Sequence, residues 1–160
     1  MNDRVSPREA TELTVRFFKS VLEASNDGVT ITDLSFSIIE ANQKFAAIFN
    51  TKCKLLMETN LLVWIKKADP EIPTKWLSAL DKIYSHKQTE IFECTFFDRC
   101  FEISGSAVAN EKDTSAVLWV FRDITERKQA EEKREQLFKE LQEALSKIKT
   151  LGGLLPICSS

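Results

Sequence analysis

The residue types that carry most enzyme chemistry are few and scattered in this chain. There is a single histidine, His86, and the cysteines, which include Cys53, Cys94 and Cys100, show no C-x-x-C spacing. A four-ligand zinc site or a Cys–His nucleophile would therefore have to be gathered from distant positions. We expect ordinary buried thiols, no metal site and no catalytic residue in this chain.

Nucleotide and nucleic-acid chemistry are also disfavoured. The chain has 4 glycines, and no two of them have the spacing of a phosphate-binding loop. Lys and Arg number 22 against 24 Asp and Glu, and the net charge of -2 supplies no broad positive field for a nucleic-acid backbone. We expect no nucleic-acid partner.

The length and composition of the chain are those of one small domain with an appendage. It has 160 residues, of which 43% are hydrophobic and 29% charged, enough to build a core without forming a membrane protein. The longest strongly apolar stretch, around Val117 to Phe121, is far shorter than the ~20 residues that span a bilayer, and no signal peptide is recognised. The sequence predicts a cytoplasmic protein with reduced thiols and no membrane insertion.

Periodicity divides the chain into elements. Residues 1–25 carry a capped, amphipathic helix pattern, and period-two runs predict strands near residues 29–33, 36–40, 90–97, 99–109 and 115–124. Helical spacing from Asn42 to Tyr84 predicts the helices between the second and third strands. A run of strands interrupted by a helical excursion predicts an α+β fold with the helices on one face of the sheet. The stretch from Ala116 to Phe121 is apolar throughout, which predicts a central strand.

Residues 126–151 have the pattern of a long signalling-type helix, rich in charge and free of Gly and Pro before Gly152 and Gly153, where we expect it to end. Apolar side chains spaced 4, 3, 4 and 3 residues apart predict a parallel homodimeric coiled coil. The alternative is a monomeric, solvated arm, because fewer than three full heptads are marginal. Residues 152–160 are predicted to be an irregular tail. The predicted dimer seam consists of Leu137, Leu141, Ala144, Ile148 and Leu151.

Several segments together resemble the PAS, or sensory-box, family. They are Ala24–Val29, Thr32–Asp33, Ile39–Asn42 and above all Phe121–Lys128, whose Asp-Ile-Thr-Glu-Arg-Lys is similar to the signature that joins PAS domains to a signalling helix. The resemblance covers roughly residues 14 to 150. It implies a five-stranded antiparallel sheet, a sensor domain over residues 26–125 and a signalling helix over residues 126–151.

The resemblance also implies a function. PAS domains detect a ligand, a cofactor or a partner and pass the change to a coiled coil that is joined to an output such as a bacterial sensor histidine kinase. The relay would run through Asp123, Ile124 and Thr125, with Asp123 and Thr125 capping the helix. Any kinase activity would lie outside this chain.

The cofactors of well-known PAS subgroups are not expected here. Leu61 stands where the flavin-binding light-oxygen-voltage subgroup carries its reactive cysteine, and Phe121 stands where that subgroup carries a flavin-bonding glutamine. His86 falls at the end of the predicted helix before the third strand, where an exposed side chain is a better expectation than a haem ligand. We predict no cofactor, and we expect neither flavin nor haem to bind.

The aromatic-rich interior leaves two interpretations open. Either bulky rings fill the core to normal density, in which case the domain responds to a protein partner, or a small pocket remains for an apolar or aromatic ligand. No Arg or Lys is predicted on the inward face, so a charged ligand is not expected. The candidate cavity residues are Ile39, Phe45, Phe49, Leu61, Trp64, Trp76, Leu80, Phe92, Cys94, Phe101, Ile103, Trp119 and Phe121.

Overall fold

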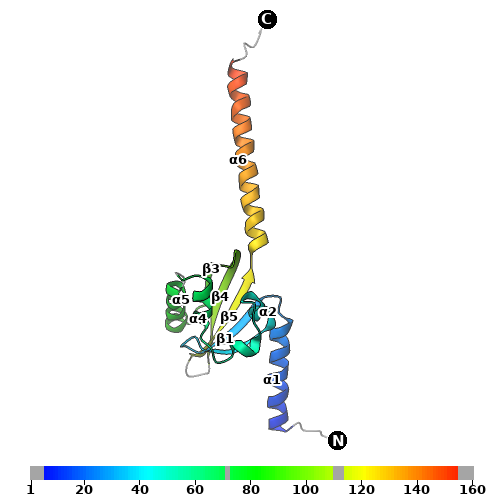
Figure 1. The fold of residues 1–160 in the computed structure, drawn as a ribbon, viewed down its shortest axis with the longest axis vertical. Coiled ribbons are helices and arrows are strands. Elements are labelled where there is room, and N and C mark those ends of the chain that lie inside the picture. The colour runs from blue at the N-terminus through cyan, green and yellow to red at the C-terminus, as the bar shows by residue number, and fades with distance from the viewer. Residues whose placement is uncertain (1–5, 71–72, 110–113, 155–160) are drawn as a thin grey trace. The chain divides into compact units, whose positions relative to one another are not determined.

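The computed structural model describes residues 6–70, 73–109 and 114–154. The chain divides into two compact units that meet between Asp123 and Ile124 (Figure 1). The first unit holds ten elements, which are α1 (Pro7–Ala24), β1 (Gly28–Thr32), β2 (Ile38–Ala41), α2 (Gln43–Ile48), α3 (Cys53–Leu56), α4 (Leu61–Ala68), α5 (Pro73–His86), β3 (Glu90–Phe96), β4 (Arg99–Ala109) and β5 (Thr114–Asp123). The second unit contains the helix α6 (Thr125–Leu154).

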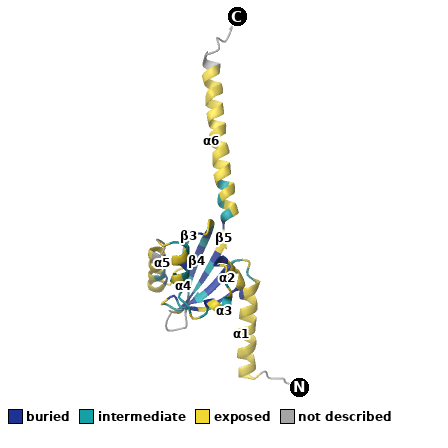
Figure 2. Cartoon of the chain, in the orientation of Figure 1, coloured by how far each residue is buried: buried dark blue, intermediate teal, exposed yellow. Residues whose placement is uncertain are grey.

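The five strands form one antiparallel sheet in the order β2-β1-β5-β4-β3. The predicted fold class is therefore confirmed, and β5 is the central strand, as its uninterrupted apolar sequence indicated. Along β5, Val117, Trp119 and Phe121 are buried on one face, whereas Leu118 and Val120 are only half-buried on the other. The buried core lies on the face of the sheet that α2 to α5 cover, and the opposite face stays partly open (Figure 2).

The helix α1 begins at a complete capping box and ends at the C-cap Ser25. The Ser6 hydroxyl accepts a hydrogen bond from the Glu9 amide, and the Glu9 carboxylate accepts one from the Ser6 amide. Of its side chains only Leu22 is buried, and its apolar face, which includes Phe17 at 69% exposure, is open along the helix (Figure 2). The predicted N-terminal helix is thus present and is attached to the core by its last turn.

The β3–β4 hairpin turns through Phe97, which the predicted third strand included. Its two turn residues are Phe97 and Asp98, and both have positive φ values, of 49° and 60°. Positive φ at both central residues is the geometry that suits the twist of a two-residue hairpin. Arg99 is instead the first residue of β4 and pairs with Phe96.

The helix α6 differs from the prediction at both of its ends. It continues to Leu154, through Gly152 and Gly153, so the expectation that the glycines stop it is wrong. Each glycine costs a helix only about 1 kcal/mol relative to alanine, which does not by itself break the backbone hydrogen bonding. At the other end Thr125 is the first helical residue, one position before the predicted start, and the Lys128 amide donates to the Ile124 carbonyl.

Candidate functional site

The interior of the first unit is a continuous cluster of aromatic rings. Trp76 from α5 packs on Trp119 and Phe121 of β5, with ring centroids 4.9 and 5.6 Å apart. Phe45 from α2 contacts Phe121 at 4.9 Å, and Phe96 from β3 reaches it at 6.4 Å. Centroid separations between 4.5 and 7 Å are those of directly packed aromatic side chains. The rings therefore occupy the space between the helices and the sheet.

The position of Trp119 is fixed from two directions. Its indole Nε1 donates a buried hydrogen bond of 3.0 Å to the Thr32 hydroxyl on β1. Its ring lies over Gly105 of β4, where a Cβ atom would be only 2.5 Å from the ring and 2.7 Å from the side chain of Ile83. The absence of a side chain at Gly105 therefore leaves the room that the indole occupies.

The indole of Trp76 is held differently, because its buried Nε1 has no hydrogen-bond partner among the described residues. The nearby Cys94 thiol is only 6% exposed, and burial raises its pKa to about 11, with Lys75 and the Trp76 indole opposing the shift. At neutral pH Cys94 is therefore a protonated thiol and a weak nucleophile. A buried N–H without an acceptor costs free energy, and a ligand that accepted its hydrogen bond would recover that cost.

Most of the predicted cavity residues lie in or against this cluster. Trp64, Leu80 and Phe92 are partly buried and pack against it. The expectation for Ile39 is wrong, because its side chain is 53% exposed and Ile38 takes the buried position in β2. Successive strand residues point to opposite faces, so only one of two adjacent isoleucines faces inward. The predicted residues with buried side chains are Phe45, Phe49, Leu61, Trp76, Cys94, Phe101, Ile103, Trp119 and Phe121.

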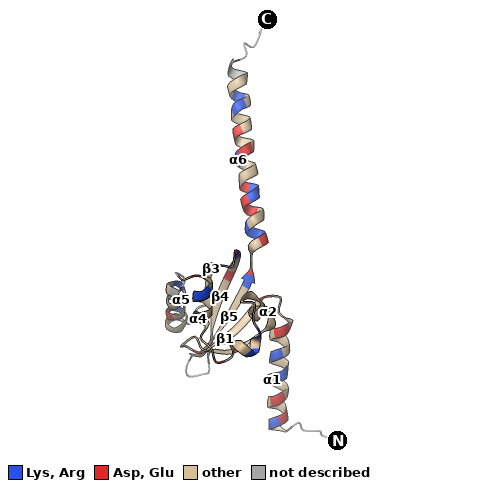
Figure 3. Ribbon diagram, viewed as in Figure 1, with Lys and Arg blue, Asp and Glu red and all other residues tan. Residues whose placement is uncertain are grey.

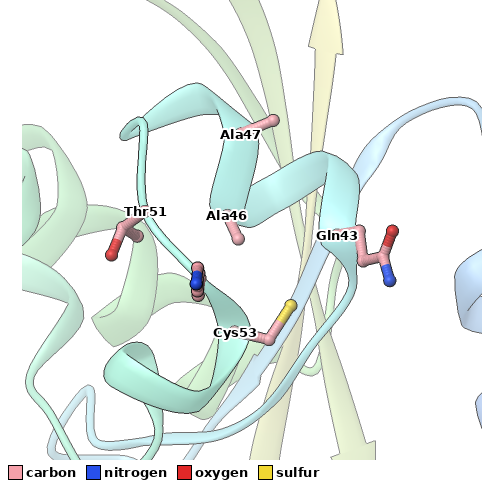
Figure 4. Close-up of a pocket in the computed structure, with 6 residues that line it drawn as sticks. Gln43, Ala46, Ala47, Thr51 and Cys53 are labelled. Atoms are coloured by element: carbon pink, nitrogen blue, oxygen red, sulfur yellow. The ribbon is translucent and has the colours of Figure 1, made fainter.

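Outside the core, a surface hollow of about 440 Å³ lies between α2 and α3 (Figure 4). It is lined by residues of both helices and their connection, and the Cys53 thiol points toward α2 within it. Burial and the neighbouring Glu23 carboxylate raise the pKa of Cys53, with a smaller contribution from Glu40. The thiol therefore stays protonated at neutral pH, and the hollow presents no activated nucleophile.

Asn42 is a structural junction between α1, β1 and α2. Its Oδ1 accepts 2.9 Å hydrogen bonds from the amides of Phe45 in α2 and Val29 in β1. Its Nδ2 donates to the carbonyls of Leu22, at 2.8 Å, and Asp27, at 3.0 Å. The side chain is 1% exposed, so a single buried amide ties the last turn of α1 to the start of β1 and to α2.

The C-terminal end of β5 carries an ion pair that sequence reasoning missed. The Arg99 guanidinium on β4 donates through both Nε and Nη2 to Oδ2 of Asp123, and it also lies over the Phe101 ring. The two charged side chains are 48% and 37% exposed, and such a surface pair contributes about 1 kcal/mol or less. Its main effect is therefore positional, because it fixes Asp123, the first residue of the predicted relay, against β4.

Only Ile124 separates the end of β5 at Asp123 from the start of α6 at Thr125. Ile124 is 3% exposed. Acidic and basic side chains are interspersed along α6 (Figure 3). A strand that carries the central core rings is thus joined to the helix through one apolar residue.

The apolar side chains of α6 form a stripe that is wider than the predicted seam. Leu141 and Ile148 are 57% and 64% exposed within the single chain. Phe138 and Leu145, which the prediction did not include, are 59% and 50% exposed and follow the same helical spacing. We call Leu137, Phe138, Leu141, Ala144, Leu145, Ile148 and Leu151 the α6 stripe.

Two of the residues on which the cofactor expectation rests lie at the ends of helices. His86 is the exposed last residue of α5, and Leu61 is a fully buried core side chain at the start of α4. Among the described residues no group of three His, Cys, Asp or Glu side chains is arranged to hold a metal ion. Within the same residues no helix is both long and apolar enough to cross a membrane.

The comparisons with known proteins identify the family. Residues 26–126 match the PAS domain family, and the chain belongs to it. Among solved structures, the PAS domain of BvgS from Bordetella pertussis has a TM-score of 0.59 at 13% identity, with 79% of this chain and 98% of that chain covered. The PAS domain of an HTR-like protein from Haloarcula marismortui has a TM-score of 0.57 at 20% identity, with 73% and 97% covered.

A third similar structure is a sensory box sensor histidine kinase from Vibrio cholerae, with a TM-score of 0.51 at 13% identity and coverage of 75% of this chain and 98% of that one. At these identities the three structures support the fold alone. No curated protein matches the chain in sequence. The chain is a PAS domain followed by the helix α6.

Proposed function

We propose that this chain is the sensory and relay module of a signal-transduction protein. A change in the PAS core would pass along β5, through Asp123, Ile124 and Thr125, to α6, and α6 would associate in parallel with a second copy. The observation that carries the proposal is the direct continuity between them, since one residue separates the ring-bearing central strand from the helix. The module itself is proposed to be non-catalytic.

The output would lie outside this chain, and a sensor histidine kinase is the class that we propose. Similar solved structures include domains described as sensory box sensor histidine kinases. The free thiols of Cys53 and Cys94 fit a reducing compartment, which supports a cytoplasmic location.

The input that we favour is a protein partner acting on a filled core, without flavin, haem or metal. Its support is the direct ring packing around Trp76, Trp119 and Phe121. A small apolar or aromatic ligand is the second candidate, and its support is the buried Trp76 N–H that lacks an acceptor among the described groups. Native mass spectrometry of the freshly purified chain separates them, because a retained ligand adds mass and a filled core adds none.

The relay is tested by weakening the start of the junction and measuring the association of α6. Arg99→Ala removes the pair with Asp123, and we expect the dimer dissociation constant to rise by up to about fivefold, as the loss of at most about 1 kcal/mol implies. Sedimentation velocity over a dilution series gives this constant. An unchanged dissociation constant would contradict the relay.

The matched control is Lys82→Ala. It breaks a comparably exposed pair with Glu90, whose atoms are 3.5 Å apart, at the edge of the sheet and away from the junction. The relay predicts no change in dimerisation for this variant. An equal effect of both substitutions would mean that the change reports general surface charge.

A further inference from the structure

An apolar hollow of about 290 Å³ lies between α5 and the turn that joins β1 to β2. Among the described residues it is lined by Leu34 from the turn and by Leu77, Leu80, Asp81 and Tyr84 from α5. Leu77 is 53% and Tyr84 50% exposed, whereas Leu34 and Leu80 pack partly against the core. The hollow therefore presents exposed apolar side chains directly beside the core.

The apolar side chains that α5 contributes to the hollow form a ridge. Leu77, Leu80 and Tyr84 follow one another at intervals of three and four residues, which places them on one face of the helix. Two turns of helix extend over about 10 Å, and ridges of this spacing pack into the grooves of a second helix. The surface is therefore elongated and suits a helix that lies along α5.

Asp81 gives the hollow a negative charge. Its carboxylate forms no ion pair and no side-chain hydrogen bond within the described part of the chain. No Lys or Arg is among the described residues that line the hollow. The positions three and four residues away on α5, where an intrahelical cation would lie, are occupied by Leu77, Ser78, Tyr84 and Ser85.

The charges around the hollow do not compensate Asp81. Lys75 and Lys82 of α5 line a different hollow, beside β3, and Lys82 pairs there with Glu90 at 3.5 Å. In the turn, the Asp33 carboxylate accepts hydrogen bonds from two backbone amides and forms no ion pair with a described residue. A basic side chain is therefore the complementary charge for an occupant of the hollow.

Both walls of the hollow are connected to Trp119, a core residue of β5. On α5, Trp76 directly precedes Leu77 and packs on Trp119 with ring centroids 4.9 Å apart. In the turn, Phe36 stacks on Trp119 at 5.8 Å, and its φ of 64° is unfavourable for a bulky side chain. A segment bound in the hollow would therefore lie close to two side chains that contact the central strand.

We propose that the hollow beside α5 binds an amphipathic, basic helix of a partner protein. The helix would lay apolar side chains against Leu77, Leu80 and Tyr84 and would place a Lys or Arg beside Asp81. Recognition of this kind, in which a helix lies in an apolar groove, depends on anchors spaced three and four residues apart. The proposal rests on the partner input proposed above and names the surface on which that partner acts.

A second copy of the chain fits this surface less well. Two α5 helices packed symmetrically would bring two Asp81 carboxylates into one contact, where like charges repel. The helix α1, with its exposed apolar face, lies on the other side of the first unit from α5 (Figure 1). Contact of α1 with α5 of a second copy would therefore join unlike surfaces and extend into a chain of copies instead of closing as a dimer.

The test uses the whole chain and a capped, alanine-rich helical peptide with leucines at positions i, i+3 and i+7 and a lysine at i+4, all on one face. We expect saturable binding that shifts the amide NMR signals of α5 and of the turn from Asp33 to Ser37. The same peptide with glutamate at i+4 should bind about fivefold more weakly, because an attraction between exposed charges becomes a repulsion.

A charge reversal in the hollow sharpens the test. Asp81→Lys should reverse the preference, so that the glutamate peptide binds more tightly than the lysine peptide. Glu143→Lys reverses a charge on the exposed surface of α6 and should leave the preference of the original chain intact. Both positions are exposed, and amide spectra check that both variants are folded.

The apolar part of the surface is tested at two matched leucines. Leu77→Gln should weaken binding of the lysine peptide about tenfold, because the complex no longer buries an apolar side chain at that position. Leu55 of α3 is 64% exposed and lies outside the hollow, so Leu55→Gln should leave the binding unchanged. Equal losses in the two variants would contradict a defined docking surface.

Four further results would overturn the proposal. They are the absence of saturable binding, equal binding of the two peptides, amide shifts confined to α1 or α6, and concentration-dependent shifts at the hollow without peptide, which would identify a second copy as the occupant. The relay is measured by the association of α6 in Arg99→Ala without any peptide. The failure of the docking surface and the failure of the relay are therefore distinguishable.

Discussion

The first unit buries its large apolar side chains, and α6 exposes them. Phe121 in the core is 1% exposed, whereas Phe138 on α6 is 59% exposed. In the core each ring contacts other rings, and Thr32 satisfies the indole of Trp119. On α6 the side chains of the stripe have no comparable cover among the described residues. Phenylalanine therefore stabilises the first unit by burial, whereas on α6 it remains exposed.

This difference in exposure distinguishes the apolar side chains that stabilise the folded first unit from those of the α6 stripe, for which we propose a role in assembly. Burying a side chain such as Leu141 or Ile148 yields about 1.5–3 kcal/mol, and on α6 that gain is available only through a second surface. An isolated helix of this length is marginal in water, and packing of its apolar face is the usual source of its stability. The first unit buries its own apolar side chains, and we propose that a second copy covers those of the helix.

Removing one phenylalanine from each unit should give the largest difference in stability between the two environments. Phe121→Ala should destabilise the first unit by about 3–5 kcal/mol, because it leaves a cavity among packed rings. Phe138→Ala should change that stability by about 0.5 kcal/mol or less, since the side chain is exposed. Urea unfolding followed by tryptophan fluorescence measures the first unit alone, because Trp64, Trp76 and Trp119 all lie in it. Similar losses for the two variants would refute the distinction.

A smaller effect is expected at the buried amide that joins α1 to the core. Asn42→Ala removes four hydrogen bonds and leaves the buried amides of Val29 and Phe45 without their acceptor, which should cost about 3 kcal/mol. The exposed Asn26 supplies the control, and Asn26→Ala should cost about 0.5 kcal/mol or less. Differential scanning calorimetry of the two variants checks the contrast. A loss below 1 kcal/mol at Asn42 would show that water replaces the junction.

The smallest predicted effect concerns alkaline pH. Burial raises the pKa of Cys94 from 9.0 to about 11, so the folded chain holds this proton more tightly than the unfolded chain. Stability should therefore fall as pH rises from about 9 to 11, by about 2 kcal/mol in total. Cys94→Ala should flatten this part of the profile relative to the original chain. An identical slope in both chains would exclude Cys94 as its source.

Local patterns predicted most of the fold because their causes are local. Period-two alternation placed Trp119 and Phe121 on the buried face of β5, and turn and cap residues set the strand and helix boundaries to within a few residues. Alternation alone did not distinguish Ile38 from Ile39, because the choice depends on the register of β2 against β1, which contains a shift between Ile31 and Thr32. Long-range geometry decides such cases.

The features that the sequence did not predict all depend on residues distant in the chain. Arg99 and Asp123 are 24 positions apart, and their pairing follows from the register of β4 against β5. Asn42 bonds to a carbonyl 20 positions earlier, which requires the end of α1 to be placed first.

The central claim, that α6 is completed by a second copy, is tested most directly by multi-angle light scattering of the whole chain and of the double variant Leu141→Asp, Ile148→Asp. The original chain should have twice the mass of the 18.3 kDa monomer, and the double variant should have the monomer mass with unchanged tryptophan fluorescence. Gln142→Asp, which adds charge beside the α6 stripe, should remain dimeric. A monomeric mass for the original chain at all concentrations, or a dimeric mass for the double variant, would contradict the account.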